Sequence, residues 1–132
     1  MRHSICLIIL LAISLIVSAC APRTAGINLS SSGETRIDDR NVARDVMVAQ
    51  QRIRLVGSLL QGSAIITSQY EKDQVVEYRF TWFDAQGFAV DADSQSWTPV
   101  ELHGKQRVQV ISVAPNPQAI KFNVYVRKSH HD

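Results

Sequence analysis

Alternation of apolar and polar residues runs through the second half of the chain and predicts β-strands. In residues 75–83 every second side chain is large and apolar, and residues 120–127 repeat the pattern. Successive side chains of a strand point to opposite faces, so each segment has one face that can be buried. Many of these residues are β-branched or aromatic, which also favours strands. The apolar positions are Val76, Tyr78, Phe80, Trp82, Ile120, Phe122, Val124 and Val126.

Weaker alternation predicts further strands. Ile53 and Leu55 alternate with Arg52 and Arg54, which indicates one dry face. Other strands are expected within 60–67, 88–90, 97–102 and 106–113. Six or seven short strands with turns between them and no long helix predict an all-β protein, an antiparallel β-sandwich or small barrel. The expected core residues are Tyr78, Phe80, Trp82, Trp97, Phe122 and Val124.

The N-terminal segment has the pattern of a lipoprotein signal peptide. Residues 5–17 are almost wholly apolar and follow Arg2, and the small residues Ser18 and Ala19 precede Cys20. As a helix this run would span roughly 20 Å, which is too short to cross a bilayer comfortably. We therefore expect cleavage between Ala19 and Cys20 and lipidation of Cys20, whose thiolate is the nucleophile that accepts a diacylglyceryl group. An ordinary cleaved signal or an uncleaved anchor is the alternative.

Lipidation at Cys20 would fix the location of the protein. Two or more acyl chains give stable membrane anchoring. Gram-negative lipoproteins that resemble this one tend to stay in the inner membrane when Asp follows the cysteine, and Ala21 stands there. The resemblance implies the outer membrane, facing the periplasm.

Composition divides the chain into four segments. We expect a signal peptide at 1–19, a lipid anchor and flexible tether at 20–45, a β-sandwich domain at 46–128 and a disordered tail at 129–132. After residue 19 the chain has 13 basic and 12 acidic side chains. Without a basic excess, a nucleic-acid partner is not expected. Cys6 would be removed with the signal, so no intramolecular disulfide can form.

Few residues indicate catalysis or ligation. The sequence contains neither a phosphate-binding glycine loop nor a nucleophile elbow. We therefore expect no cofactor, no metal and no enzyme activity. His103 lies in an expected turn, and Asp84, Asp91 and Asp93 suit turn capping better than Ca²⁺ binding. The alternative is a small hydrolase or metal-dependent enzyme with a site near His103 and the Asp91/Asp93 loop.

Outward-facing residues are the candidates for partner contacts. Arg79 and Tyr125 stand on polar faces of the two clearest strands. With Arg52 and Arg54, Arg79 could form a basic surface for peptidoglycan carboxylates or an acidic envelope protein. Cross-strand charge pairing, worth about 0.2–1 kcal/mol per pair, is the alternative explanation for these charges.

Four blocks of sequence resemble the YcfL family of bacterial periplasmic lipoproteins. The resemblance covers about 54–127 and implies an immunoglobulin-like β-sandwich with no established activity. Genes of such proteins often lie near genes of cell-wall synthesis, so the resemblance also suggests a link to that process. A fold does not by itself give a function, which has to be argued from a site. The blocks are residues 78–87, 97–100, 102–104 and 113–117.

Overall fold

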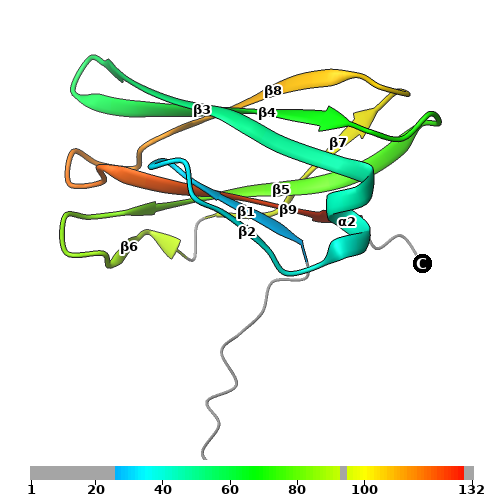
Figure 1. Cartoon of the computed structure of the whole chain (residues 1–132). Coiled ribbons are helices and arrows are strands. Elements are labelled where there is room, and N and C mark those ends of the chain that lie inside the picture. Colours follow the sequence, from blue (N-terminus) through cyan, green and yellow to red (C-terminus); the bar gives the residue numbers. More distant parts are fainter. Residues whose placement is uncertain (1–25, 93–94, 130–132) are drawn as a thin grey trace, which may run out of the picture.

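Two antiparallel sheets pack face to face in the computed structural model of the chain (Figure 1). The structure describes residues 26–92 and 95–129. One sheet has the order β2-β1-β9-β5-β6, with β7 also paired to β5, and the other has the order β3-β4-β8. The expected all-β sandwich is confirmed. The elements are β1 (Ile27–Ser30), β2 (Thr35–Ile37), α2 (Arg40–Asp45), β3 (Val46–Val56), β4 (Leu59–Ser68), β5 (Gln74–Phe83), β6 (Ala89–Val90), β7 (Thr98–Leu102), β8 (Arg107–Val113) and β9 (Lys121–Lys128).

The core fills the space between the sheets. Trp82 and Phe122 are fully buried, and their ring centroids lie 5.3 Å apart. Phe80 and Val124 are also buried, so four of the six expected core residues are confirmed, while Tyr78 packs against the core and remains partly exposed. Gly62 on β4 leaves room for the Phe122 ring, because a Cβ at this glycine would lie 2.6 Å from that ring.

The segment expected to be a tether belongs largely to the fold, which corrects the domain boundary at 46. β1 lies inside the six-stranded sheet between β2 and β9, and its Ile27 and Leu29 are 3% and 2% exposed. The short helix α2 begins where the Asp39 carboxylate accepts a hydrogen bond from the Asn41 N–H at 2.8 Å. Residues 27–45 therefore belong to the folded unit, and the Gly26 carbonyl oxygen accepts hydrogen bonds from the Asp38 and Asp39 N–H groups.

Several expectations fall outside the described residues. The proposed cleavage site at Ala19 and Cys20 lies in residues 1–25, and Asp93 and the end of the tail, residues 130–132, are likewise not described. Within 26–92 and 95–129, no helix has the length and hydropathy needed to span a membrane.

A bulge in β3 reverses which side of the strand each side chain faces. Ala49 pairs with Ile65 and Arg52 pairs with Ser63, so two residues of β3 oppose one residue of β4. Gln50 takes a left-handed conformation there, with φ of 55°. Before the bulge Val46 and Val48 face inward. After it the odd-numbered residues face inward, and Arg52 and Arg54 face solvent.

The prediction that Ile53 and Leu55 form a buried face is wrong. These side chains are on the inward side but remain 44% and 68% exposed. β3 is an edge strand, with a hydrogen-bonded neighbour on one side only, and this part of it covers little of the core. Ile120, which the alternation also places inward, is exposed and precedes β9, which begins at Lys121.

Candidate functional site

The two expected contact residues lie side by side on the outer face of the six-stranded sheet. Arg79 on β5 and Tyr125 on β9 are direct cross-strand partners. The Arg79 guanidinium carbon lies 5.7 Å from the centroid of the Tyr125 ring. Because the sheet fixes this register, the charged group and the ring are held together without help from a loop.

Trp97 joins this pair from the segment before β7. Thr98 pairs with Tyr78, which places the preceding Trp97 beside Arg79. The guanidinium carbons of Arg79 and Arg127 lie 4.7 and 3.9 Å from the Trp97 ring centroid. The expectation that Trp97 is a core residue is therefore wrong. It is half-buried on the outer face, under two arginine side chains.

One carboxylate completes the cluster. Glu77 accepts a hydrogen bond from Arg127 Nε at 2.8 Å across the strands, which confirms cross-strand charge pairing at this position. Arg79 has no such carboxylate, and its buried Nε has no hydrogen-bond partner among the described residues. The five residues Glu77, Arg79, Trp97, Tyr125 and Arg127 form what we call the arginine–aromatic array.

The array combines groups that suit recognition. A guanidinium offers planar N–H donors that match carboxylate or phosphate geometry. Trp, Tyr and Arg are the residue types that contribute most to binding energy at interfaces. Sequence reasoning identified Arg79 and Tyr125 but missed Trp97 and Arg127. Arg127 could have been predicted, because it follows Tyr125 by two residues and therefore lies on the same face of the strand.

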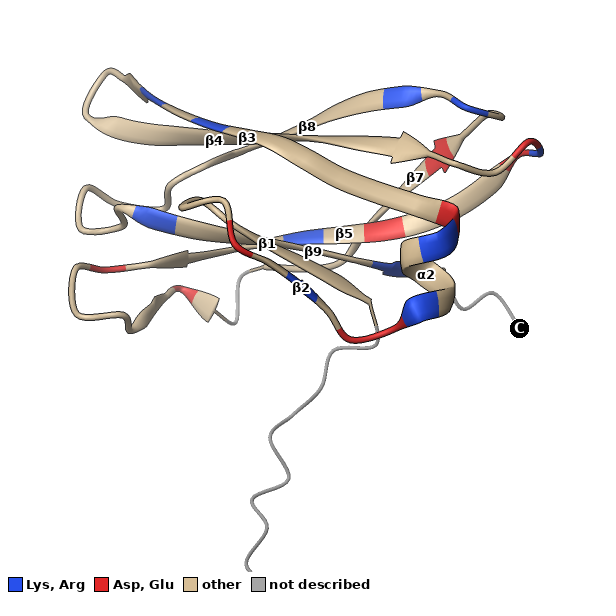
Figure 2. Cartoon of the chain, viewed as in Figure 1, with Lys and Arg blue, Asp and Glu red and all other residues tan. Residues whose placement is uncertain are grey.

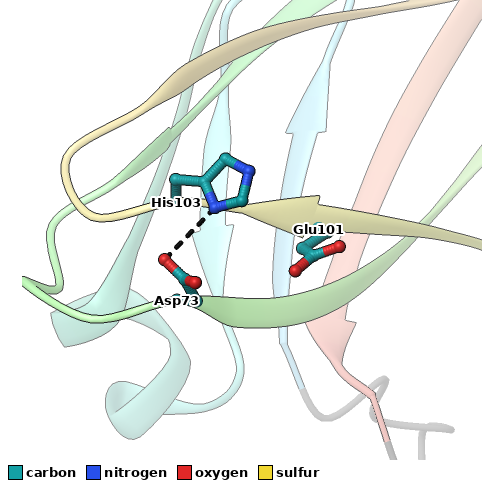
Figure 3. Close-up of side chains that lie close together, drawn as sticks. All are labelled: Asp73, Glu101 and His103. Carbon is teal, nitrogen blue, oxygen red and sulfur yellow. Dashed lines mark ion pairs between the residues drawn. The ribbon is translucent and has the colours of Figure 1, made fainter.

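His103 lies in a second cluster, at one end of the sandwich (Figure 3). Its Nδ1 is 3.2 Å from Asp73 Oδ1, and Glu101 of β7 is nearby. The turn that carries His103 is held by its N–H, which donates to Gln106 Oε1 at 2.9 Å. One ligand atom from each of the three side chains lies within 4.8 Å of the others, so together they could hold a metal ion.

This cluster is open to solvent. All three side chains are exposed, whereas a catalytic metal acts in a dry, shaped cavity. The structure also separates His103 from Asp91, although both were expected near one site. β7, which precedes His103, pairs with the start of β5, and β6, which precedes Asp91, pairs with the end of β5. His103 and Asp91 are thus at opposite ends of that strand.

The other candidate acid has a structural role. Asp84 Oδ1 accepts hydrogen bonds from the N–H groups of Gln86 and Phe88 at 3.0 and 2.9 Å. Turn capping, the preferred interpretation of the sequence, is confirmed for Asp84.

Arg52 and Arg54 do not join Arg79 in one basic surface. They face outward from the three-stranded sheet, whereas Arg79 faces outward from the six-stranded sheet on the other side of the molecule. The layers are visible in Figure 2, where the charged residues are coloured. The surface expected from sequence is therefore divided between two faces.

Asp45 links α2 to the last strand. Its carboxylate accepts a hydrogen bond from Lys128 Nζ at 2.7 Å and another from Arg44 Nε at 3.4 Å. The Lys128 hydrogen bond, against the opposing effect of burial, lowers the pKa of the Asp45 carboxyl below its ordinary value. This site is a structural junction, and a hollow of about 660 Å³ opens beside it, lined in part by Arg44, Asp45 and Lys128.

The fold and these surfaces define an all-β sandwich domain with its polar clusters on open faces. The chain belongs to the family described as "Protein of unknown function (DUF1425)", whose model matches residues 33–128. A crystal structure of a DUF1425 family member from Shewanella sp. pv-4 is similar, with 36% identity and a TM-score of 0.62. The match covers 81% of this chain and 99% of that chain.

A second solved structure shows the same fold at lower identity. Campylobacter jejuni cj0090 is 21% identical, with a TM-score of 0.54, and the match covers 62% of this chain and 85% of that chain. No curated protein is significantly similar to the chain.

Proposed function

We propose that the chain is a YcfL-like lipoprotein, held at the periplasmic side of the outer membrane through lipid on Cys20. Its sandwich would bind another envelope component without catalysing a reaction. The apolar run, the small residues and Cys20 support the anchor. The arginine–aromatic array supports the binding role.

The array is the observation that carries the binding proposal. Arg79 is half-buried between two aromatic rings, and its Nε has no hydrogen-bond partner among the described residues. Burying a polar group without a partner costs free energy. The terminal amino groups of the same guanidinium, rather than the buried Nε, would donate to a carboxylate or carbonyl oxygen of a bound partner.

Two envelope components offer such oxygens. An envelope protein supplies Asp, Glu and main-chain carbonyl groups, and peptidoglycan supplies the carboxylates of its stem peptides. Either partner would be consistent with a role near cell-wall synthesis, which the family resemblance suggests.

The corrected domain boundary sets how far the binding face would be from the anchor. Ile27 begins β1 and stands seven residues after Cys20. Seven residues cannot span more than about 25 Å even when fully extended. The sandwich would therefore stay near the membrane surface and meet partners that lie there.

Labelling with a fatty acid tests the anchor. We expect the wild-type protein to incorporate labelled palmitate and to fractionate with outer membranes, and Cys20→Ser to lose both properties. Cys6→Ser is the matched control and should keep both. Equal labelling of Cys20→Ser and wild type would contradict the proposal.

Photo-crosslinking tests the binding face. A photoreactive phenylalanine analogue at Tyr125 should give a discrete adduct that Arg79→Leu removes. Tyr70 is an exposed tyrosine outside the array and provides the control position. Identical adducts from both positions would show that contacts are random.

A metal-dependent hydrolase with its site near His103 is the second candidate, favoured by the cluster of Asp73, Glu101 and His103. Titration with Zn²⁺ in a calorimeter tests it. Binding that His103→Ala abolishes, accompanied by Zn²⁺-dependent hydrolysis of an ester substrate, would favour the enzyme. A lack of binding by the wild-type protein would exclude this site.

A further inference from the structure

The outer face of the three-stranded sheet carries basic and aliphatic side chains and no carboxylate. Arg52 and Arg54 of β3 and Arg107 of β8 provide the charge, and no Asp or Glu occurs in 46–68 or 103–113. In Figure 2 strands β3 and β8 carry blue positions, and β3, β4 and β8 carry no red ones. We call this surface the acid-free face.

The arginines of this face form no ion pair within the part of the chain that the structure describes. Among the described residues Arg52, Arg54 and Arg107 take part in no salt bridge, whereas Arg127 on the opposite face is paired with Glu77. Arg54 Nε donates to Gln61 Oε1 at 2.6 Å, which lays the guanidinium across β4. The positive charges are available to an anionic partner.

Aliphatic side chains surround these charges. Met47, Ile111 and Val113 face outward and are 46%, 48% and 51% exposed. A hollow of about 420 Å³ adjoins Ile111 and is also lined by Arg52, Ile53, Arg54, Gln61, Ser63 and Gln109. Exposed apolar surface next to arginine is typical of protein interfaces.

The chemistry of the face favours a protein over a sugar or a lipid. No aromatic residue occurs in β3, β4 or β8. Trp and Tyr are the residues that anchor proteins at membrane interfaces. Sugar binding commonly uses the same rings as flat apolar platforms. The arginine–aliphatic combination instead suits carboxylates interspersed with apolar side chains.

The edge of this sheet indicates the shape of the partner. β8 is an edge strand, paired only with β4. The Ser68 N–H binds the Gln106 carbonyl and the Ala114 N–H binds the Leu60 carbonyl, at 2.8 and 2.7 Å. Hydrogen-bonded pairs alternate along an antiparallel ladder. The even-numbered residues of β8 therefore bond to β4, and the odd-numbered ones direct their N–H and C=O groups to the free edge.

The free edge and the acid-free face share the same residues. Arg107, Gln109, Ile111 and Val113 have outward main-chain groups and also outward side chains. β8 has no proline and no bulge, which are two of the devices that protect sheet edges. A strand that pairs with β8 would form main-chain hydrogen bonds and would also bring its side chains into contact with the acid-free face.

We propose that β8 and the acid-free face bind an extended acidic segment of a partner protein, which adds to the sheet as a fourth strand. Its carboxylates would pair with Arg107, Arg54 and Arg52, and its apolar side chains would contact Ile111 and Val113. This surface is opposite the arginine–aromatic array and does not rest on the anchoring or binding proposed above.

Binding of a model peptide tests the inference. The probe is a short fluorescein-labelled peptide of alternating glutamate and valine, and the protein is the full-length chain purified in nonionic detergent. Fluorescence anisotropy should show salt-sensitive binding. Arg52→Glu with Arg54→Glu should weaken binding by about tenfold or more, since two attractive charges become repulsive.

A charge-matched variant separates this site from general electrostatics. Arg40→Glu with Lys121→Glu makes the same change in net charge at exposed positions away from the face. It should change the affinity by no more than about twofold, because distant charges are screened. Equal weakening by both double variants would overturn the proposal.

A proline on the free edge tests strand addition. Gln109→Pro removes an N–H that points away from β4, so the native ladder survives while one hydrogen bond to the peptide is lost. We expect weaker peptide binding with an unchanged melting temperature. Unchanged binding would exclude β8 as the docking edge.

Two more measurements distinguish the alternatives. Phosphatidylglycerol vesicles that bind the face as tightly as the peptide, with the same loss in Arg52→Glu/Arg54→Glu, would overturn the protein partner in favour of a membrane. Arg79→Leu should leave peptide binding unchanged while removing the Tyr125 adduct, so the two proposals can fail separately.

Discussion

The indole nitrogen of Trp82 donates a hydrogen bond to Ser112 Oγ at 3.0 Å and so joins the two sheets through the core. Trp82 is on β5 of one sheet, and Ser112 is on β8 of the other. A buried tryptophan needs such an acceptor for its N–H. The acceptor is a small residue on the inward side of the strand proposed to bind a partner.

Loss of Trp82 should destabilise the domain strongly. Trp82→Ala removes a fully buried ring and leaves a cavity, which costs about 3–5 kcal/mol. Ser112→Ala should cost about 1–3 kcal/mol, because the indole N–H would lose its acceptor. Denaturant unfolding followed by tryptophan fluorescence measures Ser112→Ala, and circular dichroism measures Trp82→Ala. A loss below about 1 kcal/mol for Trp82→Ala would mean that the ring does not support the core.

Glycine at the β3 bulge should stabilise the protein. Gln50 has φ of 55°, a conformation that costs residues with a Cβ about 1–2 kcal/mol. Gln50→Gly should therefore raise the free energy of unfolding by about 1 kcal/mol. Gln51→Gly, one position further along the strand, should lower it by about 0.5–1 kcal/mol. The same sign for both variants in urea unfolding would argue against strain at Gln50.

Stability should fall in acid through Asp45. Its pKa is lowered in the folded state, chiefly by the Lys128 hydrogen bond, so the unfolded state binds a proton more readily. The stabilisation is fully present above the ordinary Asp pKa of about 3.9 and is lost as pH falls through the lower, folded-state pKa. Melting temperatures between pH 6 and pH 2 measure this. Lys128→Met should flatten the acid limb, whereas Lys121→Met should not.

The N-terminal boundary can be tested by truncation. A chain that begins at residue 46 lacks β1, which exposes Leu29's neighbours on β9, and it also lacks α2 with the buried Val42. We expect this chain to be unfolded and a chain that begins at residue 26 to be folded, as judged by near-ultraviolet circular dichroism. Cooperative melting of the shorter chain would show that β1 is dispensable.

Strand alternation predicted most of the sandwich because it reports burial directly. Residues 75–83 and 121–127 behave as their pattern indicates, with Phe80, Trp82 and Phe122 in the core. β1 was missed because four residues, with only Ile27 and Leu29 apolar, are too short to show a period. Ile27 and Leu29 are buried in the core, where pairing with β2 across a turn and with β9 from the far end of the sequence holds β1.

The incorrect predictions for Trp97, Arg52 and Arg54 each have a physical reason. The sequence favours Trp97 as a core residue because it does not show that two guanidinium groups cover the indole ring. Alternation predicts the two faces of one strand but not which sheet the strand joins, so it does not separate Arg52 and Arg54 from Arg79. Of the candidate site, the sequence identified Arg79 and Tyr125, and strand register supplied Trp97, Arg127 and Glu77.

The position of β1 also determines how the domain would bear mechanical load. β1 is bonded on both sides, to β2 and to β9, and the chain enters it at Ile27. A pull on residue 26 directed along the strand loads the β1–β9 hydrogen bonds in shear, so they must yield together. A terminal strand on a sheet edge, pulled sideways, would open one bond at a time. Because Ile27 lies beside Val126 near the C-terminal end of β9, this shear requires the second handle at the opposite end of the sheet, where β5 ends at Phe83. Force spectroscopy between residue 26 and Gly87, just after β5, should then register a high unfolding force.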